Sequence, residues 1–464
     1  MIEENQICVS KNESLQAEKV LSRAELRKSI LSFTWPCIAE LMLVSMISII
    51  NLAMVGHLGA YAITSVGLTN QPVMVSVAVF QAFNVGATAM VARFVGAKDY
   101  ENAKKVVIQA LIIAVISGSV LCILGFSFSR WIVVTMGAQD DTVDYASMYM
   151  KYMSVGIIFQ AIPTVVTSLL RGAGDTRSPM RYNIISNIVN VLAGFIMIYG
   201  LWFIPAMGIE GAAIATTLAK FSACALSIYT IITSSLPVAV SIRDKFRLDF
   251  LMLKRIMNIG LAAAVEQLIL RTGFVIFTMV VAELGTVSFA AYQISESITG
   301  LSINFSLALG MASTSFMGRN LGAKKPEMAE AYCDELRKIA LSASMIISAC
   351  FFFGGYYITR IFTTDMEVIL LTALLMKVIA FMVPFQNSQL VLSGGLRGAG
   401  DTKWPLFAVI SGIVFVRVPL AIILIKFLHF GVWAASLAGV IDQLARSIVV
   451  YFRFRDGKWK LVKV

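Results

Sequence analysis

The sequence predicts an all-α membrane protein of about twelve transmembrane helices, arranged as two six-helix bundles related by a pseudo-two-fold axis along the membrane normal. Three observations predict this fold class. Of the 464 residues, 58% are hydrophobic and only 14% are charged; apolar segments recur along the whole chain; and two motifs repeat in the same order in each half. A soluble domain carries roughly a quarter charged residues, so the deficit indicates a lipid environment.

The predicted helices follow from segment length, because crossing the hydrocarbon core takes about 20 mostly apolar residues. Twelve segments meet this requirement: 29–55, 61–92, 104–128, 143–169, 177–200, 209–236, 253–282, 286–317, 336–358, 367–395, 404–427 and 432–452. The longest polar interruption lies midway along the chain. The predicted domains are therefore an N-terminal tail at 1–28, a bundle at 29–236, a linker at 237–252, a second bundle at 253–452 and a C-terminal tail at 453–464.

The net charge of +11 is distributed as in a membrane protein. Basic residues concentrate in alternate loops, on the side of both termini. The opposite loops hold three basic residues and four acids: Arg130, Arg360, Lys426, Asp140, Asp141, Asp365 and Glu367. Cytoplasmic loops carry an excess of Lys and Arg. We therefore expect an inner-membrane protein with both termini cytoplasmic, whose partner is the lipid bilayer and not nucleic acid.

An internal repeat is the clearest feature of the sequence. RGAGDT occurs at 171–176 and again at 397–402, so its two copies are offset by 397 − 171 = 226. RFVGAK at 93–98 matches the end of GRNLGAK at 318–324 with the same offset. Six helices per half is an even number, so the halves are parallel repeats. We expect a central cleft between them, because transporters built from repeats bind substrate at that interface.

Each RGAGDT motif follows one predicted helix and precedes the next. The simplest interpretation is a structural turn, in which glycines permit a tight bend and the aspartates cap the following helix. The residues assigned to these turns are Arg171, Gly172, Gly174, Asp175, Arg397, Gly398, Gly400 and Asp401.

Two glutamates occupy equivalent positions in the first helix of each half. Glu40 and Glu266 are related by the same offset as the RGAGDT motifs. An ionisable group inside the membrane is costly and therefore a candidate functional group. A buried carboxylate can bind and release a proton, or hold Na⁺ with neighbouring oxygens, and both properties suit ion coupling. The alternative is a structural ion pair, for instance between Glu266 and Arg271.

Other charges inside the predicted spans have more varied interpretations. Glu296 could meet Arg271 or an organic cation. Asp442 and Arg446 are four residues apart on one helix and are expected to pair. Arg417, in an otherwise apolar helix, has no obvious structural role. We assign Glu296, Arg271 and Arg417 to a substrate cleft.

Neutral amide side chains complete the expected cleft, because in lipid such groups face the bundle interior. The candidates are Gln71, Gln160, Asn187 and Gln293. Twenty-three methionines and 29 phenylalanines provide adaptable apolar surface for a polyspecific pocket.

With these motifs the chain resembles the MATE (multidrug and toxic compound extrusion) family along essentially its whole length. The resemblance rests on the two halves, the repeated RGAGDT followed by a proline, the GAK turns, MVGHLG at 54–59 and GIEGAA at 208–213. It implies secondary active efflux of amphipathic, often cationic compounds, driven by inward Na⁺ or H⁺. It implies no enzymatic activity and no cofactor besides the coupling ion; we expect a monomer.

The resemblance also assigns coupling residues. Glu266 falls on a helix 7 acid that NorM-like members use in cation coupling, which implies a possible Na⁺ near it. The helix 10 acid of those members is replaced by Gln386. DinF-like members carry acids at the positions of Asn51 and Gly194, and a nearby family asparagine matches Asn190. The coupling site is thus predicted to use one glutamate per half, with Gln386, Asn190 and Asn51 as neutral neighbours.

Two alternatives remain open. One is a flippase for lipid-linked saccharide from the same superfamily, for which Arg271 and Arg417 are the only attractive cleft cations. The other is a receptor or scaffold, against which the duplicated bundle argues. The only two histidines, His57 and His429, lie near predicted helix ends and outside any metal-ligand spacing.

Overall fold

The computed structural model is all-helical in the residues it describes. These are 22–58, 60–136, 138, 142–200, 205–234, 236, 239–240 and 248–462. Most of the predicted N-terminal tail, most of the linker and the acids Asp140 and Asp141 lie outside the described residues.

The first half supplies six long helices and one short one. They are α2 (Arg23–Gly56), α3 (Ala60–Gly96), α4 (Tyr100–Ser127), the short α5 (Ser129–Thr135), α6 (Val143–Ala173), α7 (Arg177–Tyr199) and α8 (Gly208–Thr233).

The second half repeats this order. It contains α9 (Phe250–Ala282), α10 (Thr286–Gly322), α11 (Pro326–Thr359), α12 (Met366–Gly398), a span at Lys403–Phe427 and α15 (Trp433–Arg455). The short helix η3 (Lys458–Leu461) follows α15.

The described residues therefore contain twelve long helices, as predicted. Eleven are long and apolar enough to cross a membrane by length and composition alone. The remaining one, α10, is more polar because it faces protein, and five of its serines are buried.

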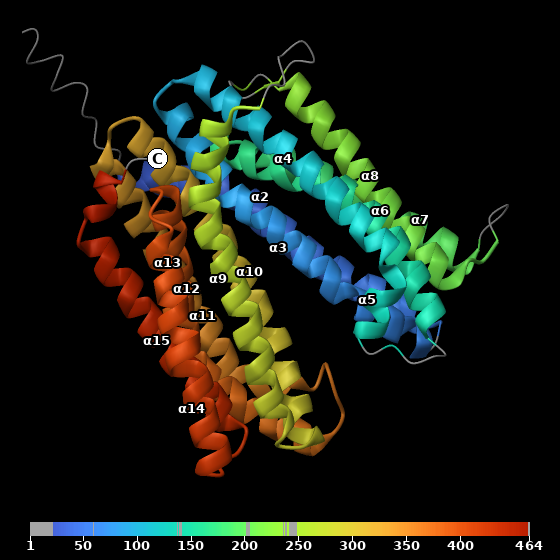
Figure 1. Cartoon of the computed structure of the whole chain (residues 1–464). Helices are drawn as coiled ribbons and strands as arrows, with labels where there is room; N and C mark the ends of the chain where they lie inside the picture. The colour runs from blue at the N-terminus through green and yellow to red at the C-terminus, as the bar shows by residue number, and fades with distance from the viewer. Residues whose placement is uncertain are drawn as a thin grey trace, which may run out of the picture.

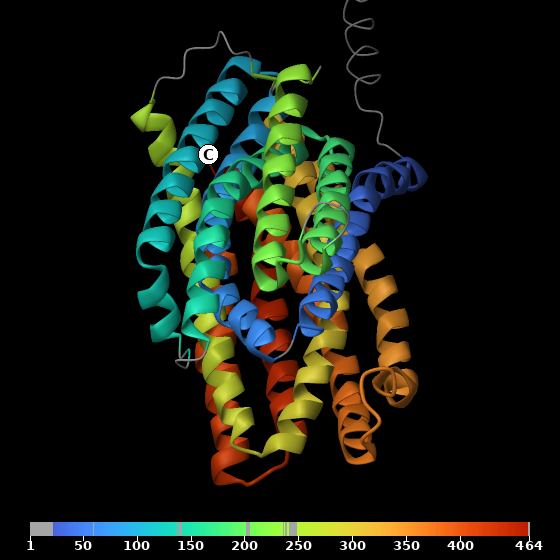
Figure 2. The same cartoon turned by 90° about the vertical axis from the view of Figure 1, so that its right-hand side faces the viewer.

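The two halves form two separate bundles. The bundles meet at the end that carries the start of α2 and the end of α15, and their opposite ends diverge (Figure 1). We call the end where they meet the terminal end. The view at right angles shows the first bundle in front of the second, with the start of α2 beside α11 (Figure 2). An ion pair joins the latter two elements across the bundles, between Arg27 Nε and Glu335 Oε1 at 2.6 Å.

Several helices begin earlier than hydropathy predicts. α2 starts at Arg23 within the predicted tail, where Ser22 and Glu25 form a capping box. α9 starts at Phe250 within the predicted linker, and α11 starts at Pro326, well before its predicted span. Hydropathy detects only the part of a helix that lies in lipid, whereas these helices continue beyond it. The short α5 is a further element that was not predicted.

The predicted C-terminal tail makes close contacts with the rest of the protein. Trp459 of η3 is fully buried and stacks on Phe454. Lys460 Nζ pairs with Glu330 of α11 at 2.6 Å, and Arg93 Nη1 donates to the main-chain oxygen of Val462 at 2.9 Å. The terminal segment therefore ties the two bundles together.

The span at Lys403–Phe427 is not a uniform α-helix. It starts as α13 (Lys403–Val409), passes through a π-helical segment, η1 (Ile410–Arg417), returns to α-helix at α14 (Val418–Ile422) and ends in a second π-helical segment, η2 (Ile423–Phe427). Such irregularities often occur at functional sites. This one ends at Arg417, a residue that the sequence had marked as unusual.

Closure at the terminal end uses the repeated GAK turns. A Cβ atom at Gly96 would lie 1.9 Å from the main-chain oxygen of Arg319, and one at Gly322 would lie 1.9 Å from that of Arg93. The two contacts are equivalent under the repeat. α3 and α10 thus cross with their backbones touching, at a distance that no residue larger than glycine permits.

The RGAGDT motifs are turns only in part. Gly174 ends α6 with a φ of 103°, and Asp175 Oδ1 accepts hydrogen bonds from the N–H groups of Arg177 and Ser178, as predicted for a cap. Asp401 instead accepts a hydrogen bond from Arg453 Nε at 2.8 Å.

The earlier residues of each motif are helical, which corrects their assignment to turns. α6 continues to Ala173 and α12 to Gly398. Gly172 packs against the backbone of Thr88, and Gly398 packs against the backbone of Thr314. The motif arginines therefore lie in the last turn of a helix and can point into the bundle.

Candidate functional site

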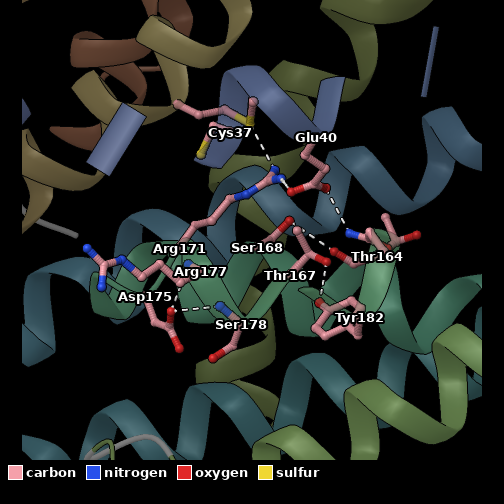
Figure 3. Close-up of polar contacts among 12 residues, drawn as sticks. Cys37, Glu40, Thr164, Thr167, Ser168, Arg171, Asp175, Arg177, Ser178 and Tyr182 are labelled. Carbon is pink, nitrogen blue, oxygen red and sulfur yellow. Dashed lines mark hydrogen bonds and ion pairs between the residues drawn. The ribbon is translucent and has the colours of Figure 1, made fainter. Parts of the chain in front are cut away.

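In the first bundle, Glu40 forms a buried ion pair with the arginine of the RGAGDT motif. Arg171 Nη2 lies 2.6 Å from Glu40 Oε2, and Asn183 Nδ2 of α7 donates to Glu40 Oε1 at 2.8 Å. Figure 3 shows the Arg171 guanidinium extending from α6 towards Glu40 of α2. Glu40 is 7% exposed. Burial of this carboxylate is thus compensated by two donors from two helices.

The second bundle repeats the pair. Glu266 Oε1 of α9 accepts from Arg397 Nη2 of α12, and Glu266 is 2% exposed. Each glutamate is separated from its arginine by the same distance in sequence, 131 residues. The predicted alternative, an ion pair between Glu266 and Arg271, is wrong: Arg397 of α12 reaches the Glu266 carboxylate, while Arg271 is exposed.

The two pairs differ in how completely the carboxylate is satisfied. The position equivalent to Asn183 is Val409, which cannot donate a hydrogen bond from its side chain. Among the described residues, Glu266 therefore has one side-chain donor where Glu40 has two. Glu266 is the less tightly held carboxylate.

The first pair also contacts the other bundle. Arg171 Nη1 lies 3.0 Å from the Met311 sulfur of α10, and the main-chain oxygen of Arg171 accepts a hydrogen bond from Ser315 Oγ at 2.8 Å. The charge pair is therefore part of the contact that closes the terminal end.

A second group of charges lies within the second bundle. Arg446 Nε donates to Asp442 Oδ1 at 2.6 Å, which confirms the predicted pair on α15. Arg417 Nη1 lies 3.9 Å from Asp442, and Arg417 Nη2 lies 3.8 Å from Glu296 of α10. We call Glu296, Arg417, Asp442 and Arg446 the charge network. Its two acids and two bases balance.

Arg417 is held in the network by aromatic rings. Its guanidinium lies 4.5 Å from the Phe274 ring centroid and 4.3 Å from that of Phe277, both on α9, and the residue is 5% exposed. Cation–π contacts of this kind stabilise a desolvated arginine. Glu296, with a side chain 29% exposed, is the most accessible member of the network.

The remaining candidate residues are more scattered. Gln71, Arg271 and Gln293 are exposed, whereas Asn51, Asn187 and Gln160 are half-buried. Asn190 Nδ2 donates to Thr216 at 3.5 Å and Gln160 Nε2 donates to Thr164 at 3.2 Å. Gln386 is buried, and its side-chain oxygen has no hydrogen-bond partner among the described residues. Glu296 meets Arg417 and not Arg271, contrary to one of the predicted options.

Arg171 and Arg397 belong to the candidate site, whereas the sequence prediction had assigned them to structural turns. Their motif looked like a turn, and no local pattern assigns an arginine to a partner 131 residues away. A signal was nevertheless present. Both members of each pair repeat at the same offset of 226, so the separation within each pair is the same in the two halves.

A protein-only metal cage is not evident in the described residues, which contain no cluster of three or more His, Cys, Asp or Glu side chains able to hold a metal ion. A Na⁺ ion near Glu266 would therefore need neutral oxygens besides that carboxylate, and this site stays a prediction.

Comparison with known proteins supports the duplicated fold. The MatE family model matches residues 36–196 and 262–423, two segments whose starting positions differ by the offset of the repeat. A relative from Thermotoga maritima, "Probable multidrug resistance protein NorM", is 26% identical over 443 residues, covering 94% of each chain. "Uncharacterized transporter YisQ" from Bacillus subtilis is 22% identical over 431 residues, covering 93% of this chain and 94% of that protein.

Solved structures share the architecture. One, "Outward-facing conformation of a multidrug resistance MATE family transporter of the MOP superfamily", has a TM-score of 0.86 at 23% identity, over 93% of this chain and 97% of that one. A MOP superfamily transporter from Pyrococcus furiosus has a TM-score of 0.87 at 22% identity, over 96% of this chain and all of that one.

Two bundles of membrane-length helices, each with a buried glutamate–arginine pair, together with the match to transporter relatives, define a membrane transporter. The chain belongs to the MATE family, because the family model matches well over half of its length in both halves.

Proposed function

We propose that this protein exports amphipathic, cationic compounds in exchange for Na⁺ or H⁺. The observation that carries the proposal is the buried glutamate–arginine pair at the same position of each bundle, one of which also forms part of the contact between bundles. The multidrug resistance names of several relatives and structural neighbours support the same assignment.

The pairs provide a means of coupling. A carboxylate that takes up a proton or Na⁺ attracts its arginine less strongly. Loss of the Glu40–Arg171 attraction would free a side chain that contacts Met311 of the other bundle. Transporters with repeated bundles work by rocking one against the other around a fixed site, so a charge-dependent contact between bundles suits that cycle.

Glu266 is the better candidate for the coupling carboxylate. It has a single side-chain donor among the described residues, so an incoming cation would replace one interaction and not two. Glu40, with two donors, would serve more to stabilise the closed terminal end.

The charge network offers a place for the cationic part of a substrate. Glu296 is its most accessible member, and its 3.8 Å separation from Arg417 leaves the carboxylate loosely paired. Gln293 is exposed one turn before it on α10. An organic cation could contact Glu296 without disrupting the closer Asp442–Arg446 pair.

Efflux from proteoliposomes tests the coupling assignment. Export of a fluorescent cationic compound is measured under separate Na⁺ and pH gradients for wild type, Glu266→Gln and Glu40→Gln. Glu283→Gln is the matched control, since Glu283 lies just beyond the end of α9 in an exposed pair with Lys426. We expect Glu266→Gln to lower gradient-driven export at least tenfold and Glu283→Gln to leave it unchanged. Equal activity of Glu266→Gln and wild type under both gradients would refute the assignment.

A flippase of lipid-linked saccharides is the second candidate. It is favoured by Arg271, which is exposed on α9 and has no ion pair among the described residues. The Pyrococcus furiosus structure is described by the words "Reverse polarity of binding pocket suggests different function of a MOP superfamily transporter", so the fold alone does not decide between these substrates. Two results together would exclude the flippase function. The Arg271→Gln variant would still export cations, and the wild-type protein would not translocate a lipid-linked saccharide.

We also propose a monomer in the bacterial inner membrane with both termini cytoplasmic. The basic residues at the terminal end support this orientation. Reporter fusions at both termini, active only in the cytoplasm, would test it.

A further inference from the structure

A cavity of about 390 Å³ lies at the terminal end and is separate from the glutamate–arginine pairs. It is bordered by α2, by the turn between α6 and α7, and by α10 of the other bundle. Its lining residues are Ser29, Ser32, Phe33, Gly174, Asp175, Thr176, Arg177, Phe316 and Arg319. Both bundles therefore contribute to its wall, so its shape depends on how closely they approach.

Positive charge dominates the lining. Arg177 and Arg319 are its two cations and Asp175 its one acid. The Asp175 carboxylate is already engaged, because its Oδ1 accepts from the N–H groups of Arg177 and Ser178. Figure 3 shows Asp175 and the extended Arg177 side chain at the start of α7.

Arg319 is positioned but has no hydrogen-bond acceptor for its side chain among the residues that the structure describes. Its Nη1 lies 2.5 Å from where a Cβ of residue 174 would be, so the glycine at that turn makes room for the guanidinium. Among the described residues, Arg319 forms no hydrogen bond through its side chain and no ion pair. An arginine donates five N–H groups in a planar fork that matches phosphate or carboxylate oxygens.

The repeat shows what such an arginine binds. Arg93 is equivalent to Arg319, and its Nη1 donates to the main-chain oxygen of Val462 at 2.9 Å. The end of the chain thus supplies an oxygen acceptor to one arginine of the pair. At the equivalent position in the second half, Arg319 lines the cavity, and no main-chain oxygen of the described residues accepts from its side chain.

The side chains that line the cavity indicate which class of ligand it could bind. Two guanidinium groups and the hydroxyls of Ser29 and Ser32 suit the oxygens of a phosphate group. Phe33 and Phe316, whose ring centroids are 5.1 Å apart, offer an apolar edge for the acyl portion of a lipid. Basic pockets between membrane helices on the cytoplasmic side are typical sites for anionic lipid headgroups.

We propose that this cavity binds a phosphate group, carried by an anionic lipid headgroup or as free phosphate, and that binding stabilises the closed terminal end. A ligand held by α2 and α7 on one side and by α10 on the other joins the two bundles. Anything that binds one conformation preferentially increases its population. The occupied site therefore favours the conformation in which the terminal end is closed, and it slows opening on that side.

The test uses the full-length protein in nanodiscs of phosphatidylcholine alone, and in nanodiscs with a graded minor fraction of phosphatidylglycerol. The melting temperature is measured in each, and again in phosphatidylcholine with inorganic phosphate at increasing concentration. Wild type is compared with Arg319→Gln, Arg177→Gln and Arg319→Lys. The matched control is Arg181→Gln, an exposed arginine one turn further along α7 and outside the lining.

We expect phosphatidylglycerol to raise the melting temperature of wild type and of Arg181→Gln. Arg319→Gln and Arg177→Gln should each raise, about tenfold, the phosphatidylglycerol fraction needed for the same rise in melting temperature. Arg319→Lys should need less lipid than Arg319→Gln, because it keeps the positive charge. An equal effect of inorganic phosphate would identify the free anion as a sufficient ligand, whereas its failure beside a lipid effect would identify the headgroup.

Two results would overturn the proposal. One is a wild-type melting temperature that responds to neither phosphatidylglycerol nor phosphate. The other is an equal response of wild type, Arg319→Gln and Arg177→Gln, which would show that the lipid acts elsewhere. If Arg319→Gln does not fold, Arg177→Gln decides alone, since Arg177 is exposed and its side chain is not part of the packed interface. Drug export plays no part in the readout, so the result is independent of the transported substrate.

Discussion

At the scale of single residues, the protein depends on a few charges buried where water cannot solvate them. Glu40 and Arg171 have side chains 9% and 11% exposed, so each is desolvated and relies on the other. A pair of this kind adds little to stability relative to apolar residues of the same size, but removal of one partner leaves a buried, unpaired charge. Replacing one residue of the pair should therefore lower the stability of the protein much more than replacing both residues together.

Arg171→Gln should destabilise the protein strongly, because it leaves the Glu40 carboxylate with only Asn183 as donor. Breaking a buried pair costs about 3–5 kcal/mol. Unfolding of the purified protein in detergent, followed by circular dichroism, measures the loss. The double variant Glu40→Gln/Arg171→Gln should recover part of it, and the exposed Arg271→Gln should have little effect. Additive losses in the double variant would contradict this prediction.

Asp442→Asn should be similarly costly. Asp442 is fully buried, and its carboxylate neutralises Arg446 directly and Arg417 at 3.9 Å, so its loss leaves two buried arginines without that carboxylate between them. We expect a destabilisation of about 3–5 kcal/mol in the same unfolding measurement. Asp456→Asn, whose side chain is 42% exposed, is the control. Similar losses for both variants would show that the network is not a buried unit.

At the scale of elements, the irregular span at Lys403–Phe427 determines how the charge network is assembled. Its π-helical segment η1 carries Gly412 and ends at Arg417. A Cβ at Gly412 would lie 2.2 Å from Asp442 Oδ1 and 2.5 Å from Arg446 Nε. The absence of a side chain at this position lets α15 bring its charged pair against η1.

Gly412→Ala should therefore force η1 and α15 apart, at a cost of about 1–3 kcal/mol, as in overpacked cores. Thermal unfolding in detergent would measure it. Gly300→Ala on α10 is a matched helical control, because a Cβ there meets nothing within 4 Å, and alanine is favoured over glycine inside a helix. The prediction fails if both variants unfold at the wild-type temperature.

At the scale of the whole molecule, closure of the terminal end depends on backbone contacts related by the repeat. Gly96 meets the Arg319 carbonyl and Gly322 meets the Arg93 carbonyl. The Arg27–Glu335 ion pair and the Arg93–Val462 hydrogen bond lie at the same end. In Figure 1 the helices separate away from this end. A cycle that opens the terminal end must break all of these contacts together.

Gly96→Ala and Gly322→Ala should each shift the protein towards an open terminal end, because a methyl group would sit 1.9 Å from a carbonyl oxygen. Spin labels at residues 100 and 325, on α4 and just before α11, would report the change as a longer distance in electron double resonance. Gly67→Ala, at a position open within 4 Å, is the control. An unchanged distance distribution in both glycine variants would show that the bundles tolerate the added bulk without opening.

Much of the architecture followed from local signals. The twelve helices and their grouping into two halves were readable because lipid demands long apolar segments and because duplication leaves an identical motif at a constant offset. The boundaries at Arg23 and Pro326 were not readable from hydropathy, since a helix can continue outside the membrane. The π-helical segment before Arg417 was not readable either, since packing against α15 decides it.

The candidate site was only partly predictable. Glu40 and Glu266 stood out because a carboxylate in an apolar helix has few explanations. Their partners did not, because Arg171 and Arg397 belong to motifs that look like turns and lie 131 residues away from the glutamates they bind.

The sequence by itself determined that this chain is a duplicated membrane bundle with one carboxylate in the first helix of each half, since period, length and composition are local properties. Only the tertiary structure decided which charge each carboxylate meets and that Asn183 donates to Glu40. It also decided that Arg319 faces a cavity while Arg93 binds the end of the chain. Electrostatic partners are chosen by distance in space, and residues far apart in sequence come within hydrogen-bonding reach only when the helices have packed.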